Sequence, residues 1–224
     1  MSAHPETFQP ADLKPQIKER PIIFSGEMVR AILAGNKTQT RRVIKPQPTY
    51  DGKDWWWNHR NGAASKNTLE TLLAAKPVEL TDHYGDVGDC LWVREAGKLD
   101  TDSKRIFIYA ATPGVCRVKD RAPDEDYHPA AHAYKPVSPI YMPRWASRLT
   151  LEITEVRVER LQDITDADAI AEGCDDPTCE SISIAPGFMR EVFKGGWDYL
   201  NSKRGFEWDS NPWVWVISFK RIEQ

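Results

Sequence analysis

The chain has 224 residues, of which 41% are hydrophobic and 28% are charged, and its formal net charge is −3. This composition is that of an ordinary globular protein with one large domain or two small ones, and no apolar run approaches the ~20 residues of a membrane-spanning helix. The negative balance excludes binding to nucleic acid through the overall field, so any contact with phosphate must be local.

Residues 1–20 are polar and contain prolines, and they lack the apolar stretch of a secretion signal. We therefore predict an N-terminal arm followed by a single domain, residues 21–224, in the cytoplasm. Four cysteines in a chain of this length do not make a disulfide framework, which agrees with a reducing compartment.

A strand, a helix and a second strand are predicted in quick succession after the arm. Residues 21–24 are apolar, and Ser25 is a suitable N-cap for a helix that Gly35 would end. Residues 38–44, TQTRRVI, combine β-branched side chains with alternation, which predicts a strand.

Further strands are predicted in GDVGDCLWVRE and RIFIYAA, and long insertions at about 46–84, 112–139 and 174–187. LTLEITEVRVERL alternates with one change of parity, which predicts a bulge near Glu155. DITDADAIAEG predicts a short helix, capped by Thr165 with Asp168 and ended by Gly173.

A second helix is predicted around 187–200, and NPWVWVISFKRI is apolar on both faces, which is typical of an interior strand. Strands outnumber helices, and no βαβ rhythm repeats. We therefore predict an α+β fold, a small mixed β-barrel with flanking helices and long insertions.

The one clear basic patch lies in residues 36–48, NKTQTRRVIKPQP, which contain Lys37, Arg41, Arg42 and Lys45 and no acidic residue. A run of this kind directly after a helix end indicates either a solvated strand or a site for an anionic or carbonyl-bearing ligand.

Four motifs in this order, AILAGNKTQTRR, GDVGDCLWVRE, ITDADAIAEGC and the final WVWVISFKRI, resemble the ASCH domains of the PUA-like superfold. The resemblance covers residues 21–46, 85–95, 140–174 and 187–223, and it is strongest to ASCH proteins of bacteriophages and prophages. It implies a protein of the bacterial host cytosol, with a cleft for RNA, a nucleotide or a modified base and with no cofactor.

One bacterial branch of this family hydrolyses N4-acetylcytidine to cytidine and acetate. The resemblance places its three catalytic roles on Lys37 and Thr40 of GNKTQT and on Glu172 of AEG. Thr40 would attack the acyl carbonyl, Lys37 would take its proton, and Glu172 would protonate the leaving amine. This chain is much longer than the members of that branch, and its insertions could reshape the cleft.

Each of these three residues also has a purely structural interpretation. Glu172 lies in the last turn of its helix, where the dipole opposes a carboxylate by roughly 0.3–1 kcal/mol, although an exposed charge there costs little. Lys37 after a helix end is favourable without any function, and Thr40 is an ordinary strand residue. On a regular strand the two would face apart, so the catalytic interpretation requires Lys37 to lie in the turn after Gly35.

A ligand-binding set is predicted beside the catalytic residues: Arg41, Arg42, Lys45, Trp55, Trp56 and Trp57. Arg42 shares its parity with Thr40 and would face the same cleft, where arginine makes two-point contacts with phosphate or a base edge. The three tryptophans would either stack on bases or fold onto the barrel.

Metal binding is not predicted. His128 and His132 have i, i+4 spacing but lie in a proline-rich loop, and Cys174 and Cys179 are spaced more widely than the usual zinc pair.

Two functions remain open from the sequence. The first is an amidohydrolase acting on N4-acylated cytidine or on another small amide of a base. The second is a non-catalytic module that binds RNA or another single-stranded nucleic acid, with arginines on phosphates and tryptophans stacking on bases. A third, a structural part of a virion, rests only on the resemblance to phage proteins. No contact with a membrane is expected.

Overall fold

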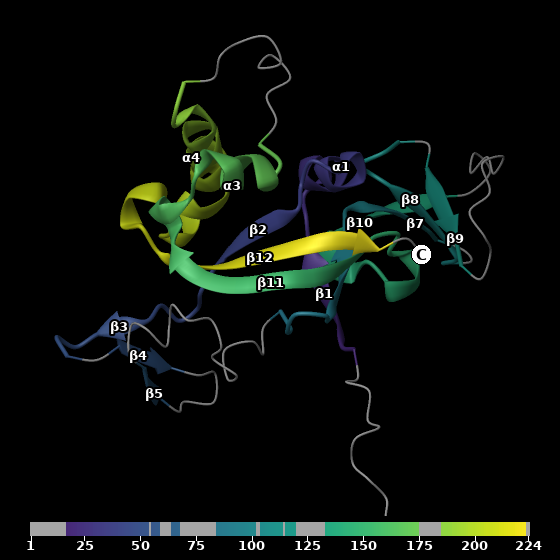
Figure 1. Ribbon diagram of the computed structural model, residues 1–224. Helices are drawn as coiled ribbons and strands as arrows, with labels where there is room; N and C mark the ends of the chain where they lie inside the picture. Colours follow the sequence, from purple (N-terminus) through teal and green to yellow (C-terminus); the bar gives the residue numbers. More distant parts are fainter. Residues whose placement is uncertain are drawn as a thin grey trace, which may run out of the picture.

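The computed structural model describes residues 17–53, 55–58, 64–67, 84–101, 104–113, 115–119, 133–174 and 185–222; for 55–58 and 64–67 it describes the backbone alone. Its elements form an α+β arrangement of three sheets and a few helices (Figure 1). None of the described helices is both long and apolar enough to cross a membrane.

The largest sheet has five strands in the order β1-β6-β11-β12-β2. Their bounds are Glu19–Ile23 for β1, Cys90–Arg94 for β6, Thr150–Arg160 for β11, Trp213–Ile222 for β12 and Gln39–Val43 for β2. β1 runs parallel to β6, and every other pairing is antiparallel. β12 lies between β11 and β2 in Figure 1, which confirms the interior position predicted for the last strand.

The predicted closed barrel is not found among the described strands, because β1 and β2 are the two edges of this sheet and do not pair. A side chain connects the two edges instead. Arg42 of β2 donates from Nη2 to the carbonyl of Ile23 at 2.6 Å, and its guanidinium lies 5.2 Å from the Phe24 ring centroid. The five-stranded sheet is therefore not closed by backbone pairing, and the Arg42 side chain bridges its two edge strands.

A second, antiparallel sheet has the order β10-β7-β8-β9, and a third has the order β3-β4-β5. The second comprises β7 (Gly97–Asp100), β8 (Ile106–Tyr109), β9 (Cys116–Val118) and β10 (Tyr134–Val137). The third comprises β3 (Thr49–Tyr50), β4 (Trp55–Asn58) and β5 (Ala64–Asn67). The segments predicted as irregular insertions thus contribute strands: β3 to β5 lie within 46–84, and β9 and β10 within 112–139.

The predicted helices are confirmed as α1 (Gly26–Ala34), α3 (Asp166–Ala171) and α4 (Phe188–Asn201). Ser25 caps α1 by accepting from the Met28 nitrogen, and Gly35 ends it with φ +83°. The described residues also form short 3₁₀ helices: η4 (Pro139–Tyr141), η5 (Arg144–Ala146), η6 (Leu161–Asp163), η8 (Ser202–Arg204) and η9 (Trp208–Ser210).

Alternate residues of β12 enter two hydrophobic clusters, as expected of a strand buried on both faces. Trp215 and Ile217 belong to the cluster that contains the buried face of α1, whereas Val214 and Val216 belong to the cluster that contains the buried face of α4. β12 therefore separates the two hydrophobic clusters. The polar site described next lies at the start of β2, the strand that pairs with β12.

Candidate functional site

The segment that leads from α1 into β2 is held by hydrogen bonds from three directions. The nitrogens of Asn36 and Lys37 both donate to the carbonyl of Ala31, at 2.9 and 3.1 Å. The Thr38 nitrogen donates to the carbonyl of Ala171 at 2.8 Å, and Lys37 forms an isolated bridge with Glu172. Lys37 thus lies in the turn before β2 begins, which is the position that the catalytic interpretation requires.

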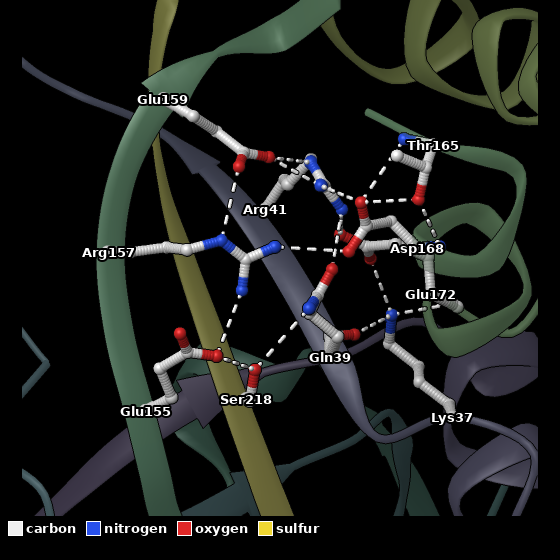
Figure 2. Close-up of polar contacts among 10 residues, drawn as sticks. All are labelled: Lys37, Gln39, Arg41, Glu155, Arg157, Glu159, Thr165, Asp168, Glu172 and Ser218. Carbon is white, nitrogen blue, oxygen red and sulfur yellow. Dashed lines mark hydrogen bonds and ion pairs between the residues drawn. The ribbon is translucent and has the colours of Figure 1, made fainter. Parts of the chain in front are cut away.

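The Lys37 side-chain nitrogen is buried and has three oxygen atoms within hydrogen-bond distance. Nζ lies 2.8 Å from Glu172 Oε2, 2.6 Å from the Glu172 carbonyl and 2.8 Å from the Gln39 carbonyl (Figure 2). Its side chain is 0% exposed. Desolvation lowers the pKa of Lys37 from its ordinary value, and this effect outweighs the opposite effect of Glu172.

Glu172 is the C-cap of α3, and its carboxylate lies between two cations. Oε2 faces Lys37, and Oε1 lies 3.4 Å from Arg41 Nη1. The unfavourable helix dipole noted in the sequence is thereby opposed by two positive charges, and one of the open carbonyls at the helix end accepts from the same lysine.

Arg41 directs its guanidinium into the protein, where it is 0% exposed. Nε lies 3.0 Å from Glu159 Oε1, and Nη1 lies 2.7 Å from Gln39 Oε1. Nη2 contacts Glu159 as well and lies 3.4 Å from Asp168 Oδ2. The donors of this arginine therefore face Glu159, Asp168, Gln39 and Glu172, and its predicted role as a ligand contact stays a prediction.

Arg157 extends the network toward the surface. It contacts Glu155 at 3.0 Å, Glu159 at 3.1 Å and Asp168 at 3.0 Å. Its side chain is 26% exposed and that of Glu155 is 55% exposed. Figure 2 shows the resulting continuous chain of polar contacts from the buried Lys37 to the exposed Glu155.

Thr40 and Arg42 have the opposite parity on β2 from Gln39 and Arg41. Thr40 is buried, and its hydroxyl has no hydrogen-bond partner in the part of the chain that the structure describes. Lys37 Nζ donates to the Gln39 carbonyl, which belongs to the peptide bond directly before Thr40. The ring of Phe24 lies 5.7 Å from Lys37 Nζ and also contacts Arg42, so these two cations flank one ring.

The other predicted ligand contacts are only partly described. Lys45 is exposed and lies 4.7 Å from the ring centroid of Phe206. Trp55, Trp56 and Trp57 form most of β4, and their side chains lie outside the description.

Of the four residues whose spacing was considered for metal binding, only Cys174 lies in the described part of the chain. His128, His132 and Cys179 lie outside it. Burial and the neighbouring Glu172 raise the pKa of Cys174 to about 11. No group of three or more potential metal ligands occurs among the residues that are described.

The site contains residues that the sequence interpretation missed, namely Gln39, Arg157, Glu159 and Ser218, while Asp168 was identified only as a capping acid. Gln39 Nε2 donates to the Ser218 hydroxyl at 3.3 Å, and the Arg157 and Glu159 contacts come from β11. The available signal was the alternation of charged residues in LTLEITEVRVERL, because residues of one parity share a face of the sheet.

Fold and site together define an α+β protein with a buried lysine–glutamate pair that a second buried cation adjoins. No protein-family model matches the chain, and no curated protein matches it. A search of solved structures gives the ASCH domain from Lactobacillus crispatus JV V101, at 12% identity and a TM-score of 0.39, over 91% of this chain and 79% of that one. A likeness this loose does not establish a shared fold, so the ASCH assignment stays a prediction from the motifs.

Proposed function

We propose that this chain is an ASCH-type hydrolase of a modified nucleoside, and that it cleaves the amide of N4-acylated cytidine. The observation that carries the proposal is the buried contact of Lys37 Nζ with Glu172 Oε2, next to the peptide bond that leads into Thr40. A lysine with a lowered pKa, an acid in hydrogen-bond contact with it and a hydroxyl without a described partner are the groups that acyl transfer through a threonine needs.

In the first half of the reaction, the Thr40 oxygen bonds to the acyl carbon and its proton passes to the neutral amine of Lys37. Collapse of the tetrahedral intermediate then breaks the bond between the acyl carbon and N4. Glu172, in contact with Lys37 at 2.8 Å, relays the proton to the departing amine, which leaves as cytidine. In the second half, water attacks the acyl-threonine ester, releases the carboxylic acid and restores the Thr40 hydroxyl.

The experiment is incubation of the purified full chain with N4-acetylcytidine, with cytidine measured by liquid chromatography. We expect turnover in the wild type and a loss of about 10²-fold or more in Lys37→Met, Thr40→Val and Glu172→Gln. Lys220→Met is the matched control, because Lys220 is an exposed lysine paired with Glu152. Absence of turnover in the wild type would overturn the proposal.

A second candidate function, binding of single-stranded RNA without catalysis, is favoured by the pair formed by Lys45 and Phe206. The exposed Lys45, which follows β2, offers a phosphate contact, and its ammonium lies over the partly buried ring of Phe206. Binding of a fluorescent RNA oligonucleotide should weaken as salt rises, and should weaken further in Lys45→Ala but not in Lys220→Ala. Equal binding by these two variants would remove this candidate.

A further inference from the structure

We propose that Arg41 is a positioning residue that reserves one oxygen of Glu172 for Lys37, and thereby keeps Lys37 a usable base. This inference rests on the proposed function and adds to it how the site maintains its proton acceptor. Arg41 is not itself in contact with Lys37 in the described hydrogen bonds, so it acts through Glu172.

The two oxygens of Glu172 have different partners. Oε2 accepts from Lys37 at 2.8 Å, and Oε1 faces Arg41 at 3.4 Å. A carboxylate that lost its second partner could turn both oxygens toward the ammonium, which would favour the charged form of the lysine. With Arg41 present, the attraction of Glu172 is divided between two cations.

Arg41 is itself fixed by residues from three elements. Glu159 of β11 binds it through Nε and Nη2, Gln39 of β2 accepts from Nη1, and Asp168 of α3 lies 3.4 Å from Nη2. The ring of Phe193 of α4 lies 5.9 Å from the guanidinium carbon. A planar guanidinium can contact Glu159 with one edge and Glu172 with another, whereas an ammonium is a single point of charge.

The described charged and titratable groups that act directly on Lys37 are Glu172 and Cys174, which follow α3, and Arg42 on β2. Arg41 reaches Lys37 only through its contact with Glu172. Glu172 and Cys174 favour the ammonium, and Arg42 disfavours it. Removal of Arg41 frees Oε1 of Glu172, so the whole charge of this carboxylate can act on Lys37. This change favours the protonated form of Lys37.

The experiment compares Arg41→Gln with Arg157→Gln in the full chain. Arg157 provides a matched control because it contacts Glu155, Glu159 and Asp168 in the same network but has no contact with Glu172 among the described residues. The titration of Lys37 is followed by NMR of protein labelled with ¹³C and ¹⁵N on lysine, with the Lys37 signal assigned from its disappearance in Lys37→Met. Circular dichroism confirms that each variant is folded.

We expect the titration of Lys37 to move to higher pH in Arg41→Gln and to stay in place in Arg157→Gln. Hydrolysis of N4-acetylcytidine by Arg41→Gln should fall about tenfold at pH 7 and recover as the pH rises, because the fraction of neutral lysine falls tenfold for each unit of pKa. An equal loss of activity at every pH, or a Lys37 titration that is unchanged or moves downward, would overturn the inference.

Arg41→Lys decides the question if Arg41→Gln does not fold. This variant keeps the charge but cannot contact Glu159 and Glu172 along two edges, so the Lys37 titration should again move upward. The NMR readout does not depend on the proposed substrate. A wild type without hydrolase activity whose Lys37 titration responds as expected would refute the proposed function and leave the positioning role supported.

Discussion

Lys37 Nζ and the carboxyl group of Glu172 lie 2.8 Å apart, although the two residues are separated by 135 positions in the sequence. The contact is a consequence of two helix ends, because Gly35 ends α1 just before Lys37 and Gly173 follows the C-cap of α3. Thr38 joins the two segments by donating to the carbonyl of Ala171. The site is therefore part of the packing of the fold and does not depend on the orientation of a loose surface loop.

The stability of the folded chain should rise with pH above neutrality relative to a Lys37→Met variant. Burial lowers the pKa of Lys37 in the folded state, whereas the unfolded chain retains an ordinary lysine. Between these two pKa values the unfolded state binds more protons, so the free energy of unfolding increases as the pH rises. Urea unfolding at several pH values between 7 and 10 measures the difference between wild type and variant.

Lys220→Met is the reference for this measurement, because Lys220 is an exposed lysine, 62% accessible, and pairs with Glu152 at the surface. Its stability should follow that of the wild type across the same range. A wild type and a Lys37→Met variant whose curves stay parallel from pH 7 to 10 would contradict a lowered pKa for the buried lysine.

Gly173→Ala should destabilise the protein and disturb the site. A Cβ at this position would lie 3.0 Å from the Ala31 Cβ and 3.1 Å from the Lys37 Cβ, and the residue has φ +86°. We expect a loss of about 1–3 kcal/mol in the free energy of unfolding, from the left-handed backbone and the overpacking together. Gly205→Ala separates the two effects, because Gly205 also has positive φ but no atom within 4 Å of the place that an added methyl would take. Equal losses in both variants would exclude the steric contribution.

The helix ends and the bulge were predictable because each depends on neighbouring residues. The register of β11 against β12 changes between Ile153 and Glu155. This irregularity lies where the change of parity in the sequence predicted a bulge. As a result Val158 belongs to the hydrophobic cluster and Val156 packs against it, while Glu159 contacts both Arg41 and Arg157. Without the bulge, the strict alternation that starts at Leu151 would place the charged residues in the core.

The inward direction of Arg41 was not predictable from its own segment. Residues 36–48 contain no acid, so the stretch looked like an anion site, but its acidic partners Glu159 and Glu172 come from β11 and α3. The absence of pairing between β1 and β2 was likewise not predictable, because pairing between strands far apart in the sequence leaves no local signal. Alternation along a strand predicts on which face of the sheet each side chain lies, but it does not predict which strand lies next to it.

Arg148→Met should lower the free energy of unfolding, because Arg148 is the partner of a buried carboxylate that lies between β6 and β7. Arg148 Nε and Nη2 donate to the two oxygens of Glu95, at 2.8 and 2.9 Å, and Nη1 donates to Thr112 at 2.8 Å. The Glu95 side chain is 1% exposed. Loss of the arginine leaves this carboxylate buried and unpaired, which should lower the free energy of unfolding by about 3 kcal/mol.

The double variant Arg148→Met with Glu95→Gln tests the cause of that loss. Removal of the stranded charge should restore part of the stability, so the double variant should be more stable than Arg148→Met alone. The exposed pair of Arg144 with Glu19 is the control, with side chains 43% and 49% accessible, and Arg144→Met should change stability by about 1 kcal/mol or less. Additive losses in the double variant would show that the charge pair is not the cause.

The stability of the folded chain should fall in acid through Asp166, which ties the start of α3 to the start of α4. Its carboxylate accepts from the nitrogens of Gly187 at 2.6 Å and Arg190 at 2.9 Å, and these hydrogen bonds lower its pKa. An acid whose pKa is lower in the folded state stabilises that state above its unfolded pKa of about 4, and the contribution disappears as the pH falls through the folded value. Urea unfolding between pH 6 and pH 3 should therefore show a smaller acid-dependent loss for Asp166→Asn than for the wild type. Identical acid dependence in Asp166→Asn and the wild type would mean that these backbone contacts do not hold the two helices together.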